Sequence, residues 1–434
     1  MSLHDRLKFN KKKRNKITDK NVNFLSFKKW LKDGGAEFPN LYFKKYSDNE
    51  RGVHSNKNIK NDTEIMYIPH HLLITDELDC NLSRDLGNDL FSMANTTLQK
   101  LAMYILETIE DDDNFYQPYY GILPDDIGHL PIFWDDSTLK LLENSDFLED
   151  IASRKKMLTR EYNEIASKSK LFKNTISLND WMWARSIVGS RNFSINVNGI
   201  QRSAMVPLAD MLNHIRPAET LWGYDNAKRG FTMTSLSDIK PHAQLMDSYG
   251  RKSNRKYLLH YGFVMDNNIE KNNTCDDDVC IEFDFPGYSP TVNNYLLNRH
   301  QKLYVTKDNF IAKILPLMRK LNMNDEELKK YGENASCNTI VCKRNELAAL
   351  VSISNLIRNR LRKYPKTYYE NLSTLKKMKG FSKERNAVNF VKKQKELLLL
   401  IKSMADTMIP YVINDTIPES NQIHPDYRMY LNYN

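Results

Sequence analysis

Two stretches of the sequence decide the fold: Val206-Pro207-Leu208-Ala209-Asp210-Met211-Leu212-Asn213-His214 and Ser248-Tyr249-Gly250-Arg251-Lys252-Ser253-Asn254. Each places polar side chains directly after a short apolar run, a pattern typical of a strand that leads into a site. Taken alone, Asn213-His214 also fits a turn with a satisfied core histidine, and Tyr249-Gly250 fits a strand end with a buried phenol. The two stretches together are more specific, and they indicate a functional site built on strands.

Short strands are predicted on both sides of these stretches, where β-branched and aromatic residues are bounded by turn-rich segments. They cover Gly52–Ile59, Glu64–Ile68, Ala204–Leu208, Gly230–Ser235, Ala243–Ser248 and Cys280–Phe285. Between the second and third of these strands, Leu98, Leu101, Ala102 and Ile105 mark one apolar face of a helix. A longer helical stretch covers Leu139–Ile165. The strands are therefore interrupted by a helical segment.

Helices are also predicted at both ends of the folded part. A first helix begins near Asn23, has an apolar face and ends at Gly34-Gly35. After Pro290 helices are expected throughout, because helical spacing recurs over Phe310–Leu321, Glu346–Tyr364 and Ala387–Met408. The predicted fold class is α+β, with a helical C-terminal domain.

Length and composition narrow the class of protein. The 434 residues are enough for more than one domain, and 41% apolar with 27% charged residues exclude a fibrous or mainly disordered chain. No run approaches the ~20 apolar residues that a bilayer requires, and the N-terminus lacks the apolar core of a signal peptide. Five cysteines spread over this length do not form a disulfide framework. We expect a soluble intracellular protein with reduced thiols.

The positive charge is concentrated in two regions. The net charge is +9, yet Met1–Lys20 holds eight Lys or Arg against two Asp, and Arg358–Lys402 holds fourteen against three acids. One interpretation is an electrostatic footprint for nucleic acid, ribosomes or an acidic protein. The other, which the sequence favours, is a disordered tail and solvated helix faces. The predicted localisation is the cytoplasm. The nucleus is the alternative, because Lys11–Arg14 also matches a short nuclear signal.

Several common chemistries have no motif in this chain. It contains no G-x-G-x-x-G, no G-x-x-x-x-G-K-[ST] and no G-x-S-x-G, so a Rossmann site, a P-loop and an α/β-hydrolase elbow are not supported. The pairs Cys275/Cys280 and Cys337/Cys342 are spaced more widely than a usual zinc hairpin. We therefore predict no metal site.

The ordered set of motifs resembles the SET-domain methyltransferases, in the subclass similar to the Rubisco large-subunit lysine methyltransferase. The motifs are, in chain order, Arg51-Gly52-Val53, Gln117-Pro118-Tyr119, Leu123-Pro124, Ser190-Arg191-Asn192-Phe193, Asp210-Met211-Leu212-Asn213-His214, Tyr249-Gly250-Arg251-Lys252-Ser253-Asn254 and Tyr261-Gly262-Phe263. Each is weak alone, but seven in this order form a strong signal. The resemblance implies a SET domain over 23–289 with a helical insert at about Thr75–Ser177, and a helical substrate-binding domain over 290–434. The dense charge before this region predicts a disordered basic tail over 1–22.

The resemblance also implies a cofactor and site residues. The cofactor is S-adenosylmethionine, and Tyr249 lies beside the transferred methyl group, where its hydroxyl orients the acceptor. Asn213 and His214 hold the adenine end, and Asp210 supports their loop. Arg191 binds the cofactor's carboxylate. The turn that contains Arg51, Gly52 and His54 packs along the cofactor, with Gly52 permitting close backbone approach.

The residues that wall the acceptor channel bear on which side chain is methylated. The resemblance implies that these residues are Phe193, Ala209, Tyr224 and Tyr261. In the actin-histidine branch of this subclass, the position of Phe193 is polar and that of Ala209 is Trp. Two apolar residues here resemble the channel of the lysine branch, so lysine is favoured over histidine. The alternative is that both are ordinary core residues whose size reflects local packing.

One residue departs from the family pattern. The position seven residues before Tyr249, usually Gly, is His242, which is strained by about 1 kcal/mol if the turn needs a positive φ; the turn is otherwise rebuilt around Pro241. The predicted function is a protein-lysine N-methyltransferase acting on a non-histone protein, with a ribosomal or translation-related one in view. The alternatives are a protein-histidine N-methyltransferase and a non-catalytic scaffold. We expect a monomer with no membrane contact, and direct nucleic-acid binding stays open.

Overall fold

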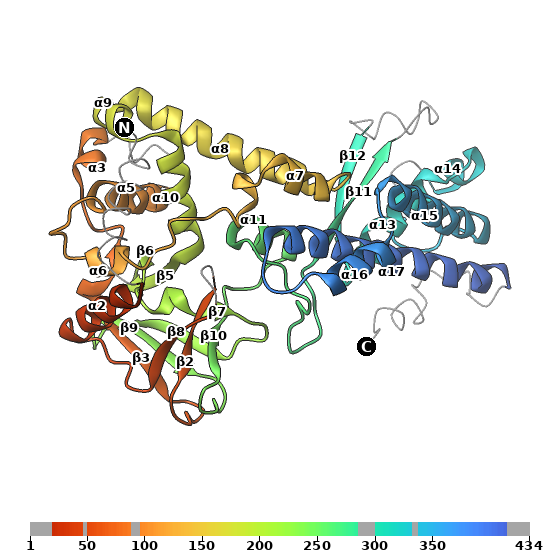
Figure 1. The fold of residues 1–434 in the computed structure, drawn as a ribbon. Helices are drawn as coiled ribbons and strands as arrows, with labels where there is room; N and C mark the ends of the chain where they lie inside the picture. Colours follow the sequence, from red (N-terminus) through yellow and green to blue (C-terminus); the bar gives the residue numbers. More distant parts are fainter. Residues whose placement is uncertain (1–19, 47–49, 88–95, 285–299, 332–336, 415–434) are drawn as a thin grey trace. The chain divides into compact units, whose positions relative to one another are not determined.

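The computed structural model describes residues 20–46, 50–87, 96–284, 300–331 and 337–414. The chain forms two compact units, which Figure 1 shows in sequence colours. The first comprises Met1–Phe133 with Ile151–Arg251, and the second comprises Trp134–Asp150 with Lys252–Asn434. The basic tail predicted at 1–22, with Lys11–Arg14, lies outside the described residues up to position 19.

The described residues of the first unit form three small sheets. One has the strand order β1 (Leu41–Lys45), β2 (Arg51–Ser55), β10 (Gln244–Asp247) and β7 (Asn213–His214). The second has the order β3 (Glu64–Pro69), β9 (Gly230–Ser235) and β8 (Thr220–Asp225). The third has the order β4 (Ile74–Thr75), β6 (Ile200–Met205) and β5 (Asn192–Val197). All pairings are antiparallel except that of β10 with β7.

Strands that precede the helical segment pair with strands that follow it (Figure 1). The pairs are Val53 with Leu245, Ile68 with Phe231, and Ile74 with Met205. All six side chains are fully buried, so each sheet joins the two halves of the unit through apolar contact. The predicted strands are confirmed here, with ends that differ by a few residues.

Helices fill the interval between these two sets of strands. In the first unit they are η1 (His70–Leu72), α3 (Asn81–Leu86), α5 (Thr96–Thr108), α6 (Gln117–Tyr120), η2 (Pro131–Phe133), α8 (Phe147–Lys168), α9 (Lys170–Thr175) and α10 (Leu178–Arg191). The first residues of α8 belong to the second unit, as do α7 (Asp136–Leu139) and η3 (Lys140–Leu142). The predicted helix around Leu101 is confirmed as α5, whose face of Leu101, Ala102 and Ile105 is buried.

No helix was predicted from the sequence over Leu178–Arg191, which the structure shows as α10. A capping box of Ser177 and Asp180 starts this helix. Trp181 and Arg185 are both buried, and the Arg185 guanidinium pairs with the equally buried Glu161 at 2.9 Å. A helix that is buried on several sides has no one-sided apolar stripe, so periodicity did not reveal it.

The N-terminal helix of the first unit follows the sequence closely. Helix α2 covers Lys20–Asp33, which begins three residues before the predicted Asn23. It ends at Gly34-Gly35 as predicted, and Gly35 has a φ of +81°, which glycine adopts without strain. Phe27 and Leu31 on its inner face are fully buried.

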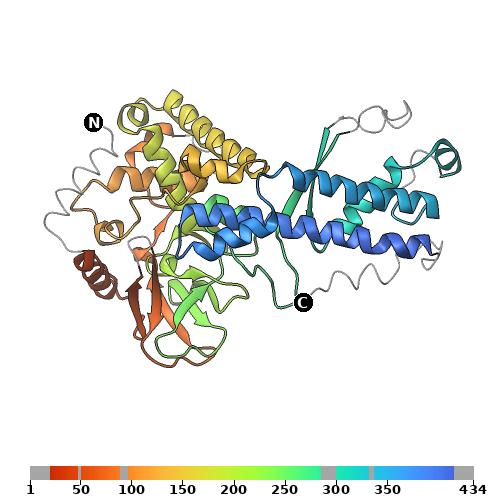
Figure 2. The ribbon, with the colours of Figure 1, turned by 45° about the vertical axis from the view of Figure 1, so that its right-hand side comes forward.

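The second unit is mainly helical. Its elements are α11 (Asn254–Tyr261), β11 (Asp278–Asp284), β12 (His300–Thr306), α13 (Phe310–Leu321), α14 (Asp325–Tyr331), α15 (Lys343–Lys363), α16 (Tyr368–Lys377) and α17 (Lys383–Ile413). Helices α15 and α17 lie side by side in both Figure 1 and Figure 2. Helices α13, α15 and α17 confirm the three predicted C-terminal helices. The expectation of helices throughout was wrong in one place, because β12 pairs with β11.

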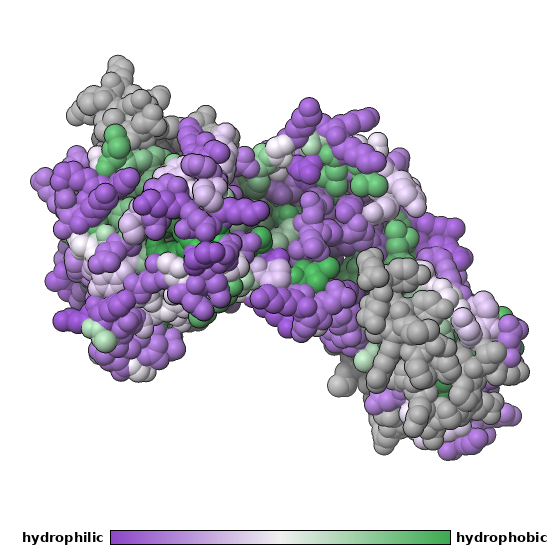
Figure 3. Space-filling view, turned by 90° about the horizontal axis from the view of Figure 1, so that it is seen from below, coloured by the Kyte–Doolittle hydropathy of each residue, from purple (hydrophilic) through white to green (hydrophobic). Residues whose placement is uncertain are grey.

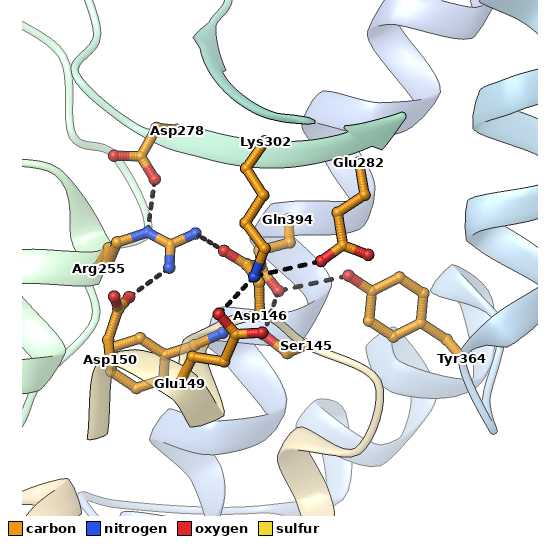
Figure 4. A network of polar contacts seen from close by, with 11 residues as sticks. Ser145, Asp146, Glu149, Asp150, Arg255, Asp278, Glu282, Lys302, Tyr364 and Gln394 are labelled. Atoms are coloured by element: carbon orange, nitrogen blue, oxygen red, sulfur yellow. Dashed lines mark hydrogen bonds and ion pairs between the residues drawn. The ribbon is translucent and has the colours of Figure 1, made fainter. Parts of the chain in front are cut away.

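A network of charges connects the parts of the second unit (Figure 4). At the start of α11, Arg255 binds Asp146 at 2.5 Å, Asp278 at 2.7 Å and also Asp150. Gln394 of α17 donates to Asp146 at 3.0 Å. The segment Trp134–Asp150 is thereby joined to α11, β11 and α17, although it lies far from them in sequence.

The α+β class, with a β-rich part interrupted by helices and a helical C-terminal part, is confirmed. The predicted domain limits stay predictions, since the boundary at 289/290 lies outside the described residues. None of the helices that the structure describes has the length and apolar character needed to cross a membrane. No disulfide joins any of the five cysteines.

Candidate active site

The two deciding stretches lie side by side in the first unit. Strands β7 and β10 pair in parallel, with Asn213 opposite Met246 and His214 opposite Asp247. The backbone N–H of Tyr249 donates to Nδ1 of His214 at 3.0 Å, and the two rings are 5.0 Å apart. Because Nδ1 accepts this bond, a neutral His214 carries its proton on Nε2.

The phenol of Tyr249 has a fixed position. Its hydroxyl donates to the backbone carbonyl of Leu212 at 2.8 Å, one residue before Asn213. A hydroxyl that donates to a carbonyl keeps lone pairs on its own oxygen, and these can accept from an N–H group or face a positive centre. The geometry therefore suits a tyrosine that orients an acceptor nitrogen.

Asn213 connects the stretch to β2. Its side-chain amide donates to the carbonyl of Arg51 at 2.8 Å. At the next residue, Gly52, a Cβ would lie 2.5 Å from the amide nitrogen of Gln244 and 2.7 Å from the hydroxyl of Tyr46. A side chain at this position would therefore require Gln244 and Tyr46 to move. The predicted close approach of Gly52 to the cofactor stays a prediction.

A buried group of charges surrounds Asp210. Its carboxylate, which is 1% exposed, accepts from Arg191 at 3.0 Å and from the hydroxyl of Tyr119 at 2.8 Å. Arg191 also donates to the backbone carbonyl of Asp210 at 2.9 Å. Burial first, and then the nearby Arg191, lower the pKa of Arg51 to about 10. Two guanidinium groups thus lie near one carboxylate, and this part of the site is positively charged.

This charged group fits an anionic ligand. Among the described residues, Nη2 of Arg51 and Nε of Arg191 are buried and have no hydrogen-bond partner. Buried guanidinium nitrogens are costly without an acceptor, and a carboxylate is the acceptor that matches their geometry. The methionine-type carboxylate of S-adenosylmethionine meets this requirement.

His54 has a structural engagement that the sequence did not predict. Its Nδ1 lies 2.8 Å from the carbonyl of His242, and its Nε2 lies 2.5 Å from the hydroxyl of Tyr46. The ring is buried and both nitrogens contact protein atoms. His54, on β2, therefore connects Tyr46, the residue after β1, with the turn before β10. Its predicted contact with the cofactor stays a prediction.

The departure at His242 keeps the backbone geometry of a glycine. His242 has a φ of +63°, so the turn was not rebuilt to avoid a positive φ. Its N–H donates to Ser55 at 2.8 Å, which fixes the turn to β2. Histidine is among the residues that adopt this region more readily, and we expect a cost of about 1 kcal/mol.

The four predicted channel residues do not form one described cluster. In the first unit, Phe193 packs against Trp222 and Phe231 at ring distances of 5.1 and 5.2 Å, and Ala209 is buried beside Asp210. The hydroxyl of Tyr224 lies 3.0 Å from Nδ1 of His70. Tyr261 ends α11 in the second unit, and burial raises its pKa to about 12. Their roles in a channel stay predictions.

Three residues near the site were missed by the sequence analysis. They are Tyr119, which binds Asp210, Tyr46, which binds His54, and Gln244, which lies against Gly52. Tyr119 stands in the Gln117-Pro118-Tyr119 motif, so a signal existed for it. No pattern of spacing links it to a carboxylate so distant in sequence. Among the described residues, no group of three or more His, Cys, Asp or Glu is arranged to hold a metal ion.

Asp247, the residue opposite His214, predicts a pH dependence of stability. Burial raises its pKa to about 6 from 3.8, although Thr220 donates to its carboxylate at 3.1 Å. A raised pKa means that the folded state favours the protonated acid. The contribution of Asp247 to the free energy of unfolding is therefore fully present below about pH 4. It is lost as the pH rises through about 6.

We expect Asp247→Asn to raise the free energy of unfolding by about 2 kcal/mol at pH 7.5, and to leave it unchanged below about pH 4. Urea unfolding of both proteins across this pH range measures the difference. An Asp247→Asn protein that is less stable than wild type at pH 7.5 contradicts the assignment.

Comparison with known proteins agrees with this geometry. The SET domain family model matches residues 50–250, and the Rubisco LSMT substrate-binding family model matches residues 292–398. Curated relatives include the actin-histidine N-methyltransferases of Rhinolophus ferrumequinum and Xenopus tropicalis. They are 27% and 26% identical over 72% and 71% of this chain. The chain spans about half the length of these relatives, since the matches cover 55% of each.

Solved structures show the same fold. The SET domain of LSMT bound to lysine and AdoHcy aligns with a TM-score of 0.71 at 18% identity, covering 91% of this chain and 93% of that one. The structure of Rubisco LSMT bound to AdoMet aligns with a TM-score of 0.70 at 17% identity, covering 94% and 99%. At this level of identity the likeness concerns the fold.

Proposed function

We propose that this chain, which belongs to the SET-domain methyltransferases and carries a Rubisco LSMT substrate-binding domain, transfers a methyl group from S-adenosylmethionine to a nitrogen of a protein side chain. The observation that carries the proposal is the parallel pairing of β7 with β10, which brings His214 and Tyr249 together beside Leu212. Bound S-adenosylmethionine supplies a methyl carbon already activated by its sulfonium.

The chain's own residues bind the cofactor, orient its methyl carbon toward the acceptor and exclude water from the site. Arg191 and Arg51 offer buried donors to the cofactor's carboxylate, and Asp210 keeps the Arg191 guanidinium in place. By resemblance, Asn213 and His214 hold the adenine. Gly52 leaves space for a close backbone approach. These contacts align the methyl carbon with the acceptor, and alignment is the main contribution an enzyme makes to such a displacement.

The acceptor nitrogen must be neutral when it attacks. A lysine has a free pKa near 10.4, so it is almost wholly charged at neutral pH until burial removes water. A histidine has a free pKa near 6.5 and needs less assistance. For lysine, the Tyr249 oxygen, whose proton is directed to Leu212, can accept from a hydrogen of the neutral amine and so orient its lone pair. The attacking nitrogen of a neutral histidine carries no hydrogen, so there the Tyr249 oxygen would face the positive charge that develops on the ring.

The comparisons support histidine better than lysine as the acceptor. The curated relatives at 25–27% identity are named actin-histidine N-methyltransferases, whereas the structures with lysine ligands are 17–19% identical and speak for the fold. On these names alone the acceptor would be a histidine of a non-histone protein. This is the second candidate.

The chain's own residues favour lysine, which we retain as the proposed acceptor. Phe193 and Ala209, at 9% and 1% exposure, are both apolar and buried. Neither can donate a hydrogen bond to an imidazole or stack an indole on it. Such a lining suits the alkyl chain of lysine and favours its neutral amine by excluding water.

The wider biological assignment is also part of the proposal. The substrate is a non-histone protein, and a ribosomal or translation-related one remains an alternative to an actin-like one. The chain acts as a monomer in the cytoplasm. The actin-histidine relatives support a non-histone substrate by name.

One experiment decides the reaction and the acceptor together. The full chain is incubated with methyl-labelled S-adenosylmethionine and a lysate freed of small molecules, and the labelled protein is hydrolysed to amino acids. A reaction without the chain gives the background of the lysate's own enzymes. We expect label in methyllysine above this background.

Each outcome has a distinct meaning. Label in methylhistidine overturns the argument from Phe193 and Ala209 and keeps the methyltransferase function. No label, with no binding of S-adenosylmethionine by calorimetry, overturns the proposal in favour of a non-catalytic scaffold.

A further inference from the structure

Six exposed cations lie in two groups, at the end of α15 before α16 and at the C-terminal end of α16, in the second unit. They are Arg362, Lys363, Lys366, Lys376, Lys377 and Lys379, here called the basic face. The only acid within residues 362–379 is Glu370. Its carboxylate accepts from the backbone and side chain of Thr367 in a capping box, so it is engaged with the helix end.

The periodicity of α16 places Lys376 on the same side as Tyr369. Tyr369, Ser373 and Lys376 are four and three residues apart, so they share one face of the helix, and all three are exposed. Tyr369 is 76% exposed, the highest value among the large apolar and aromatic residues that are described. A tyrosine offers contact area together with a hydroxyl, and it is a common anchor in interfaces.

The turn that carries this face is held rigidly from within. Lys395 of α17 is buried and donates to the carbonyl of Lys366 at 2.6 Å and to the side chain of Asn371 at 2.5 Å. Its ammonium also lies 4.7 Å from the centre of the Tyr364 ring. At the other end of α16, Arg385 donates to the carbonyls of Leu375 and Met378 at 3.0 and 2.7 Å.

These internal contacts separate two kinds of cation. Lys395 and Arg385 are used on backbone carbonyls, and Lys392 and Lys402 pair with Glu396 and Asp406. No ion pair with an acid is found for the six residues of the basic face within the described part of the chain. Hydrogen bonds from Thr367 and then the charge of Lys366 lower the pKa of Glu370, so Lys366 is partly compensated. The backbone that carries the other five cations is fixed in place, which favours preorganised recognition of an anion.

We propose that the basic face binds an acidic segment of the protein substrate. Charge complementarity identifies the partner, and Tyr369 gives it one aromatic contact. Hydrophilic residues cover most of the coloured surface seen in Figure 3, with apolar residues between them. A single-stranded nucleic acid fits less well, since stacking platforms for bases use several aromatic residues.

This inference rests on the proposed function in one respect: it takes the acidic partner to be the protein that the chain methylates. It adds a requirement on the substrate's sequence, namely a cluster of Asp or Glu away from the methylated residue. Binding at the basic face needs no methyl transfer, so its failure and the failure of the proposed function are measured separately.

The test compares two charge reversals in the full chain. Lys376→Glu with Lys377→Glu alters the basic face, and Lys329→Glu with Lys330→Glu alters exposed lysines of α14, where Asp325 and Glu326 already balance the charge. The probe is a fluorescent peptide of alternating glutamate and serine, measured by anisotropy at low salt and at ~150 mM salt. Single-stranded RNA of equal length is the second probe.

We expect the basic-face variant to weaken binding of the acidic peptide by about tenfold, and the α14 variant to change it by less than about twofold. Circular dichroism and S-adenosylmethionine affinity should match wild type in both, which excludes unfolding. Equal losses in the two variants, or no peptide binding by wild type, overturn the proposal. RNA that binds more tightly than the peptide and loses affinity only in the basic-face variant assigns the face to nucleic acid instead.

Discussion

Tyr249→Phe should lower the rate of methyl transfer by at least about 100-fold while leaving the affinity for S-adenosylmethionine within a few fold. The hydroxyl is directed by the carbonyl of Leu212, and the ring lies beside His214. Removing the oxygen leaves the acceptor nitrogen without the group that orients it. The backbone bond to His214 stays, so the cofactor site should persist. Initial rates with labelled cofactor measure the loss.

A matched control separates catalysis from stability. Loss of a buried hydroxyl bond costs about 1 kcal/mol in itself, so rates must be compared at equal folded fraction. Tyr67→Phe removes a hydroxyl that donates to the carbonyl of Lys228 at 2.7 Å, a similar bond at another place in the first unit. We expect this variant to keep nearly full activity. A Tyr249→Phe protein as active as Tyr67→Phe would remove Tyr249 from the mechanism.

Arg255→Met should lower the free energy of unfolding by about 3 to 5 kcal/mol, the largest stability loss we expect from a single change. The substitution leaves Asp146, whose side chain is 1% exposed, buried beside Asp150 and Asp278 without its cation (Figure 4). A buried carboxylate without its counter-ion is costly, and the hydrogen bond that Gln394 still donates to Asp146 replaces only part of the lost interaction. Urea denaturation, followed by fluorescence and circular dichroism, measures the loss.

A second substitution tests the cause of this loss. Asp146→Asn in the Arg255→Met background removes the uncompensated charge and should recover part of the stability, giving a coupling energy in a double-mutant cycle. Lys60→Met, which breaks a largely exposed pair with Asp238, should change stability little. A cycle without coupling between Arg255 and Asp146 contradicts the network as described.

Local sequence patterns predicted the helices and strands that bury only one face. The limits of α13 and β9 agree with the predicted Phe310–Leu321 and Gly230–Ser235, because each has a clear apolar period and turn residues at its ends. Helix α10 escaped notice because residues on several of its sides are buried, Arg185 included. Strand β8 escaped notice because Gly223 and its half-buried neighbours give no alternation.

The sequence predicted which residues form the candidate site better than it predicted which of them contact one another. The motifs named Arg191, Asp210, His214 and Tyr249, and the structure joins the first two by an ion pair and the last two by a hydrogen bond. The hydrogen bond from Tyr119 to Asp210 joins residues on distant segments, and such partners depend on tertiary pairing that spacing cannot express. The sequence also gave no sign that Tyr224 meets His70.

The pairing of early strands with late ones has a consequence for synthesis of the protein on the ribosome. Val53 finds its partner only when Leu245 has been made, and Ile68 waits for Phe231. At roughly 5–20 residues per second, β3 remains without β9, and β2 has only β1 beside it, for about 10 to 40 seconds. During that time their apolar side chains and open edges are exposed to other nascent chains. The first unit thus depends on chaperones or on its own helical segment for protection until the last strand emerges.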